Sequence, residues 1–166
     1  MKLVVVIMIM LLCTIISTIY VKQIKNHTKS VMQFILLIEN IKILIEYKNT
    51  SISELFYILC SCDSYNLLTF LDEISNGLED YQKTVCNVFS CNNSKCHFDQ
   101  EDIEHIKNFF LMLGTSDTNG QIVNCNLYKN IFEKKYSQLY SAEKSKCKCT
   151  STLSIGLGIL ISIFII

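Results

Sequence analysis

The chain has 166 residues, half of them apolar, and its 15 lysines balance 15 acidic residues with no arginine. We therefore expect no nucleic-acid partner, because such proteins carry a basic excess. The chain has nine cysteines, and because nine is an odd number they cannot all form disulfides within one chain. We expect them to be thiols, because the orientation argued below places the central domain in a reducing compartment. With no proline and only five glycines, long helices are permitted throughout.

The first part of the chain reads as a transmembrane helix. Residues 3–21 contain no charge, and as a helix they extend about 28 Å, the thickness of the hydrocarbon core of a bilayer. A cleaved signal peptide is the alternative, which would leave a tail-anchored tether. We favour a retained helix, because the apolar run is longer than usual for a signal peptide and no small-residue cleavage site follows it.

A second apolar segment ends the chain, and the charges beside the two segments predict their orientation. Residues 149–166 are uncharged and extend about 27 Å as a helix. Lysines follow the first segment and precede the second, which places the region between them in the cytosol. We predict a two-pass protein of the cell membrane, with transmembrane helices at 1–21 and 153–166 and a cytosolic helical bundle at 22–152.

The central region has the apolar spacing of helices. Steps of three and four residues run through 22–47, and Ser51 with Glu54 forms a capping box that opens the next helix. Further helices are expected at 67–74 and 78–89, with a turn at Asn76–Gly77, then after Asp99 and again from Asp117 to Lys148. No stretch alternates with a period of two. The predicted fold class is therefore all-α, a membrane-anchored helical bundle.

Charge is separated along this region. Nine acids lie between residues 63 and 104 against two lysines, whereas residues 129–148 hold six lysines and two acids. We expect the basic ends to face anionic membrane lipid and the acidic middle to point into the cytosol. An acidic tip favours a basic protein partner, and we predict contacts by these residues: Glu73, Glu79, Asp80, Glu101 and Asp102. A merely solvated surface is the alternative.

We expect no catalytic residues. None of the three histidines lies in a known signature, no glycine-rich phosphate loop is present, and most carboxylates lie in helix first turns or on polar faces. We therefore expect a non-enzymatic protein without cofactor, metal or small-molecule substrate. The alternative is a membrane-tethered thiol or zinc-binding protein that uses the cluster Cys86, Cys91, Cys96 and His97, although its spacing is unlike paired zinc knuckles.

The segment before the last helix resembles a known family. Its sequence is Leu113-Gly114-Thr115-Ser116-Asp117-Thr118-Asn119-Gly120-Gln121, and Ala142-Glu143-Lys144 and a terminal apolar segment with Gly156 follow. This pattern resembles the C-terminal half of the stage III sporulation protein AB family. Residues 45–54 are similar to the family's turn into its second helix, except that Lys48 and Ser51 replace the usual glycine and proline. Gly114 is expected to end one helix, Ser116 to cap the next and Asp117 to lie in its first turn, while Gln121 is the last residue of the motif that carries the resemblance.

The resemblance implies a function. Members of this family belong to the sporulation channel complex between mother cell and forespore, and their helical domain is similar to the type II secretion F protein, the platform for a secretion ATPase. By this resemblance, the protein would lie in the mother-cell membrane around the forespore. Its partners would be the stage III sporulation protein AA-type ATPase and the other membrane subunits.

Overall fold

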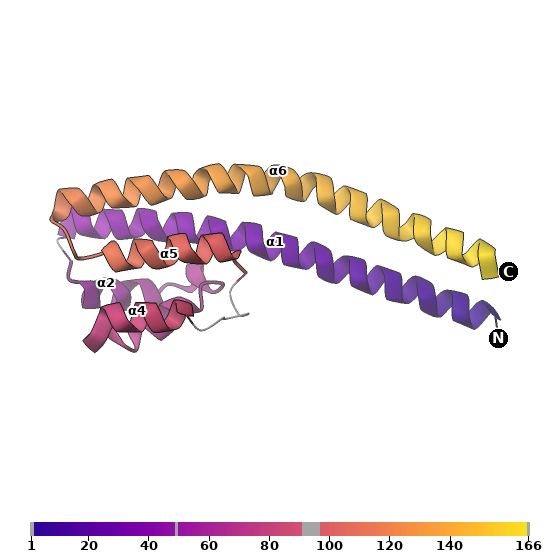
Figure 1. The fold of residues 1–166 in the computed structure, drawn as a ribbon, viewed down its shortest axis with the longest axis horizontal. Helices are drawn as coiled ribbons and strands as arrows, with labels where there is room; N and C mark the ends of the chain where they lie inside the picture. The colour runs from indigo at the N-terminus through magenta and orange to yellow at the C-terminus, as the bar shows by residue number, and fades with distance from the viewer. Residues whose placement is uncertain (1, 49, 91–96, 166) are drawn as a thin grey trace. The chain divides into compact units, whose positions relative to one another are not determined.

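A computed structural model shows the fold and describes the backbone of residues 2–48, 50–90 and 97–165. Within these ranges, side chains are described except at 2–7, 9, 10, 13, 63 and 146–165. Every element of this described part is helical, which confirms the all-α prediction (Figure 1). In chain order the elements are α1 (Lys2–Lys48), α2 (Ile52–Cys60), η1 (Asp63–Tyr65), α3 (Phe70–Ser75), η2 (Leu78–Asp80), α4 (Tyr81–Ser90), α5 (Gln100–Met112) and α6 (Thr118–Ile165).

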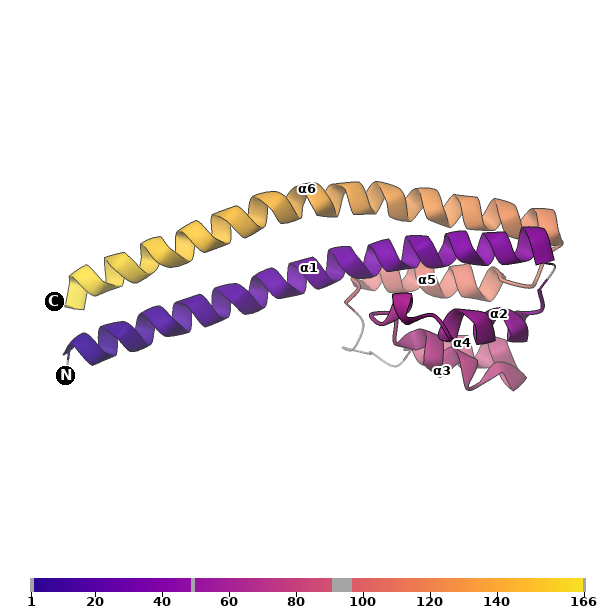
Figure 2. The ribbon, with the colours of Figure 1, turned by 180° about the vertical axis from the view of Figure 1, so that it is seen from behind.

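The chain divides into two compact units, and α1 and α6 contribute to both. One unit comprises residues 29–136, and the other comprises residues 1–28 and 137–166. In the unit 29–136, hereafter the bundle, the end of α1 runs antiparallel to the start of α6, and the four shorter helices pack beside this pair (Figures 1 and 2). The boundaries predicted from hydropathy, after residues 21 and 152, concern the membrane and stay predictions.

Local capping signals explain where the helices begin. The Ser51 hydroxyl accepts a hydrogen bond from the backbone N–H of Glu54 at 3.3 Å, which is one of the two hydrogen bonds of the predicted capping box and confirms Ser51 as the N-cap of α2. Asp99 occupies the N-cap of α5, and its backbone N–H donates to the Asp102 carboxylate. Gly77 ends the turn between α3 and η2, and its carbonyl oxygen accepts a hydrogen bond from Thr84.

The core of the bundle is a cluster of aromatic rings around Phe34. This side chain of α1 is fully buried, and its ring centroid lies 4.6 Å from that of Phe132 on α6 and 5.8 Å from that of Phe109 on α5. Phe70 of α3 and Phe110 of α5 also lie within 6.5 Å of it. Edge-to-face geometry predominates, which aromatic pairs prefer over face-to-face stacking. One residue thus joins α1, α3, α5 and α6.

Among the residues whose side chains are described, no helix has a stretch long and apolar enough to cross a membrane. The side chains of the predicted segment 153–166 are outside the described set, and so are some side chains of the predicted segment 1–21. Both transmembrane helices stay predictions.

Phe34→Ala tests this account of the core. Loss of a fully buried ring of α1 that packs against rings of three other helices is expected to lower the free energy of unfolding by about 3–5 kcal/mol. Urea unfolding of the full chain in detergent, followed by circular dichroism, measures this change. Tyr57→Ala is the control, because the Tyr57 ring is 79% exposed. Equal effects of the two substitutions would contradict the proposed core.

Candidate interaction surfaces

The five acids predicted to bind a partner differ in exposure. Glu79 and Asp80 are exposed on η2, and Glu101 is exposed in the first turn of α5. Glu73 is half-buried on α3. Asp102 is fully buried and forms an ion pair with Lys135 of α6. Asp102 is therefore a structural residue of the core and not a surface contact.

The fold also places these acids at opposite ends of the bundle, and not at one tip. Lys135, the partner of Asp102, lies 17 residues after the start of α6, which is about 26 Å along that helix. The start of α5 therefore lies far from the turn that opens α6. Tyr81 follows η2 directly, and its hydroxyl donates to the carbonyl oxygen of Phe110 near the end of α5. Gly114, just beyond that end, lies against Ile52, the first residue of α2. Glu79 and Asp80 thus lie at the end where α2 begins.

The ion pair of Asp102 and Lys135 holds the start of α5 against α6. The Lys135 ammonium also lies 3.8 Å from the Asp99 carboxylate, so it contacts both carboxylates of the α5 capping box. The Asp102 carboxylate additionally accepts the backbone N–H of Asp99. A buried carboxylate needs such partners, because its desolvation is costly.

A groove of about 440 Å³ lies between α2 and the α3–η2 segment. Tyr57 lines it with its ring 79% exposed, and Ser53 and Leu78 lie on opposite walls. The next residues along the chain, Glu54 and Glu79, are both exposed acids. Below the groove, the Tyr81 hydroxyl donates to the Phe110 carbonyl oxygen at 2.8 Å, and burial raises the pKa of Tyr81 well above its usual range. The groove thus combines an exposed aromatic ring with flanking negative charge.

The segment from Gly114 to Gln121 forms a tight turn between α5 and α6. Gly114 has φ +76°, and a side chain there would also collide with Ile52, so glycine is required for both reasons. Its N–H donates to the Gln121 side-chain oxygen at 3.2 Å, and the Gln121 amide nitrogen donates to the Ser116 carbonyl oxygen at 3.0 Å. The Asp117 carboxylate accepts the N–H of Gly120 at 3.1 Å.

A family model described as stage III sporulation protein AB matches residues 2–166. The chain belongs to this family. Neither the search of curated proteins nor the search of solved structures gave a match.

The family motif therefore has a structural explanation in this member. Gly114 ends α5 as predicted, and Gln121 closes the turn through its two side-chain hydrogen bonds. The predicted cap was wrong by one residue: Asp117, not Ser116, caps α6, because its carboxylate accepts the N–H at the N3 position. Ser116 contributes its backbone carbonyl instead. The sequence alone did not show which of these two adjacent residues would cap the helix, because both serine and aspartate are common at that position.

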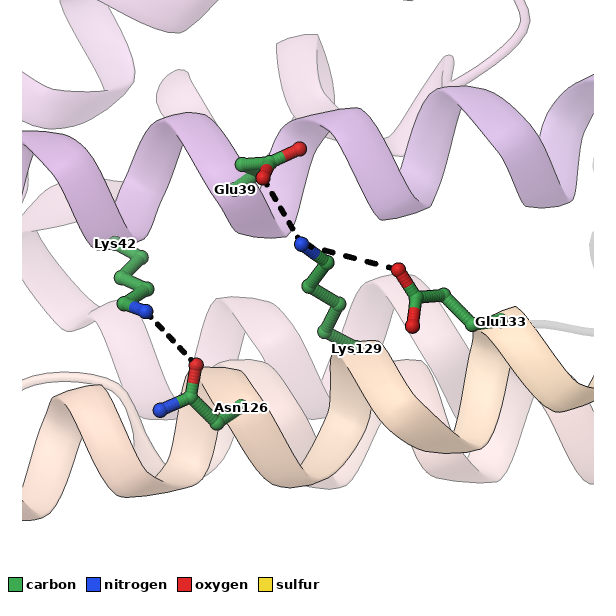
Figure 3. Close-up of polar contacts among 5 residues, drawn as sticks. All are labelled: Glu39, Lys42, Asn126, Lys129 and Glu133. Atoms are coloured by element: carbon green, nitrogen blue, oxygen red, sulfur yellow. Dashed lines mark hydrogen bonds and ion pairs between the residues drawn. The ribbon is translucent and has the colours of Figure 1, made fainter.

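A polar row joins α1 to α6 along the bundle of this family member (Figure 3). Lys129 donates to Glu39 at 2.9 Å and lies 3.8 Å from Glu133, while Lys42 donates to the Asn126 side-chain oxygen at 3.0 Å. The hydrogen bond to Glu39 raises the pKa of Lys129. Sequence analysis missed this row, because nothing in either helix alone indicates which residues of the other will lie opposite.

The cysteines that the structure describes, Cys60, Cys62, Cys86 and Cys125, are all thiols without a disulfide. Cys60 and Cys62 are exposed at the end of α2, Cys86 is half-buried on α4, and Cys125 is buried on α6. The thiol or zinc hypothesis needs Cys91 and Cys96, which lie outside the described residues. That hypothesis stays a prediction, as does the contact role of the acids.

Asp102→Asn tests the structural role assigned to the buried carboxylate. We expect a loss of roughly 3 kcal/mol in the free energy of unfolding, because Lys135 loses its buried counter-ion. The double variant Asp102→Leu with Lys135→Met should recover most of that loss, since no charge of the Asp102–Lys135 pair is then left buried without its partner and Asp99 is exposed to water. Glu101→Gln, at the exposed neighbouring position, should change stability by less than about 0.5 kcal/mol. A neutral effect of Asp102→Asn on urea unfolding would contradict this assignment.

The buried thiol of Cys125 should make the protein less stable at alkaline pH. Burial raises the pKa of its thiol to about 11, so between pH 9 and 11 the folded chain keeps a proton that the unfolded chain releases. Stability therefore falls as pH rises through this window. From pH 8 to pH 10, the free energy of unfolding of Cys125→Ala should fall by about 1 kcal/mol less than that of the parent protein. Urea midpoints at the two pH values measure this difference, and Cys62→Ala, at an exposed position, should behave like the parent.

Proposed function

We propose that this member of the stage III sporulation protein AB family is a non-enzymatic membrane subunit of the sporulation channel complex. In this proposal it is anchored in the mother-cell membrane around the forespore, and its bundle serves as the platform for a cytosolic secretion-type ATPase. The ATPase would be of the stage III sporulation protein AA type, and the other membrane subunits would be further partners. The observation that carries the proposal is the exposed Tyr57 groove with its flanking acids.

Membrane anchoring has support from the first part of α1. This segment exposes large apolar side chains by 52–65%: Met8, Leu11, Leu12, Ile15, Ile16 and Ile19. Such exposure in water is costly for a monomer, whereas lipid favours it. The lysines after this segment favour a cytosolic bundle.

The groove end is suited to a basic partner. An exposed tyrosine flanked by carboxylates is typical of a binding hot spot, because its ring supplies apolar area and its hydroxyl a hydrogen bond. Glu54, Glu79 and Asp80 supply negative charge near it. Within the part of the chain that the structure describes, only Asp80 of these three forms an ion pair, with Lys83 at 3.9 Å, and that pair is exposed. Complementary charge speeds association and selects against acidic proteins.

Binding of the ATPase tests the platform. The full chain in detergent is expected to bind the purified ATPase, and Tyr57→Ala combined with Glu79→Lys should weaken binding at least tenfold, by loss of the ring and by charge reversal. Glu101→Lys is the matched control, since it reverses an exposed acid at the opposite end of the bundle. Binding that is equally sensitive at both positions, or at neither, would reject the groove as the contact.

Deletion of the gene in its host tests the biological role. We expect a block in spore formation after forespore engulfment, with normal vegetative growth. Complementation with the groove variant should fail, and complementation with Glu101→Lys should restore heat-resistant spores. Normal spores after deletion would reject the proposal.

A further inference from the structure

A second groove lies on the first part of α1, in the compact unit that comprises residues 1–28 and 137–166. Its volume is about 350 Å³, which falls in the size range of ligand-binding sites. The described residues that line it are Ser17, Thr18, Val21, Lys22 and Lys25. We call it the lysine groove. It combines two ammonium groups with two hydroxyl groups on one stretch of helix.

The unit that contains the lysine groove is positively charged, although the whole chain is neutral. Residues 1–28 and 137–166 hold six lysines and one acid, Glu143, whereas residues 29–136 hold nine lysines and fourteen acids. The two formal charges are therefore +5 and −5. Lys22 and Lys25 are exposed, and neither forms an ion pair within the part of the chain that the structure describes. Their charge is available to an anionic ligand.

Ser17 supplies the lysine groove with a hydrogen-bond donor. The residue lines the groove but is only 9% exposed, and its hydroxyl has no hydrogen-bond partner among the described residues. The Thr18 hydroxyl, by contrast, donates to the Ile15 carbonyl oxygen at 2.8 Å. Because a nearly buried hydroxyl without a partner is costly, the Ser17 position favours a ligand that brings an acceptor oxygen.

The chemical groups along this part of α1 follow the order of a phospholipid molecule. Exposed apolar side chains come first, up to Ile16. The Ser17 hydroxyl follows, and the ammonium groups of Lys22 and Lys25 come last, with about 12 Å of helical rise between residues 17 and 25. A phospholipid presents acyl chains, ester carbonyl oxygens and a phosphate in the same order. A free phosphate ion matches only the ammonium end.

We propose that the lysine groove binds an anionic phospholipid, whose phosphate is held by Lys22 and Lys25 and whose ester carbonyl oxygen accepts a hydrogen bond from Ser17. Basic pockets on the cytosolic side of transmembrane helices bind anionic headgroups through the same attraction. A zwitterionic lipid has the same phosphate and esters, but the lysines repel its ammonium group. The proposal rests on the membrane anchoring proposed above.

Lipid binding to the full chain in detergent tests the selection by charge. Native mass spectrometry measures the dissociation constants of phosphatidylglycerol and of phosphatidylcholine with the same acyl chains. The parent protein is expected to prefer phosphatidylglycerol by about 30-fold, and Lys22→Gln with Lys25→Gln should abolish that preference. Lys48→Gln with Lys83→Gln is the matched control, because it removes the same charge at exposed positions of the bundle, and it should keep the preference. Equal binding of the two lipids by the parent protein, or equal effects of the two double variants, would overturn the proposal.

Ser17→Ala tests whether the bound molecule is a lipid or a phosphate ion. Loss of one hydrogen bond should weaken the binding of both lipids about fivefold and leave the preference between them unchanged. Thr14→Ala is the control, because the Thr14 hydroxyl is exposed on the same helix and already donates to the Leu11 carbonyl oxygen. Unchanged lipid affinity of Ser17→Ala, or displacement of the lipid by inorganic phosphate, would overturn the lipid assignment.

Failure of the lipid site is distinguishable from failure of the proposed function. A chain that stays in solution without detergent would reject membrane anchoring, and the lipid site with it. A chain that needs detergent but binds both lipids equally would reject the lipid site alone. Binding of the ATPase at the Tyr57 groove is a separate measurement, and the substitutions at Lys22 and Lys25 should not change it.

Discussion

The packing of aromatic rings around Phe34 is the contact on which the rest of the bundle depends. Three helices, α3, α5 and α6, present rings to this one side chain of α1, and α2 joins the cluster through Phe56, whose ring lies 6.0 Å from that of Phe110. Each ring buries a large apolar area, and the edge-to-face contacts add directional preference. Short helices such as α3, with six residues, are unstable alone, so this shared core is what keeps them in place.

Polar contacts then determine how the long helices are matched along their length. An apolar seam by itself tolerates sliding, because one methyl group packs nearly as well as another. Two ion pairs oppose such sliding, because a shift of one helical turn would separate their charges. They are the pair of Lys129 with Glu39 and the buried pair of Asp102 with Lys135. A few charged side chains therefore set the register of α6 against α1 and α5, although most of the stabilisation comes from the packed aromatic rings.

The surfaces available for function are those that this core leaves uncovered. Burial of Asp102 removes one acid from any partner contact, and the direction of α5 carries Glu101 away from Glu79 and Asp80. The Tyr57 groove remains as an exposed surface between α2 and the α3–η2 segment.

Much of the fold was predictable from the sequence, because its signals are local. Apolar spacing identified the helical segments, Ser51 and Asp99 identified helix starts, and Gly114 identified an end, because glycine readily adopts the positive φ that the structure shows there. The motif around Gly114 and Gln121 also identified the family. The tertiary structure alone decided that Asp102 is a core residue, that the acids occupy two ends of the bundle, and that Tyr57 lines a groove. These properties depend on which residues of other helices lie opposite, through contacts such as that between residues 102 and 135, and the spacing within one helix carries no information about them.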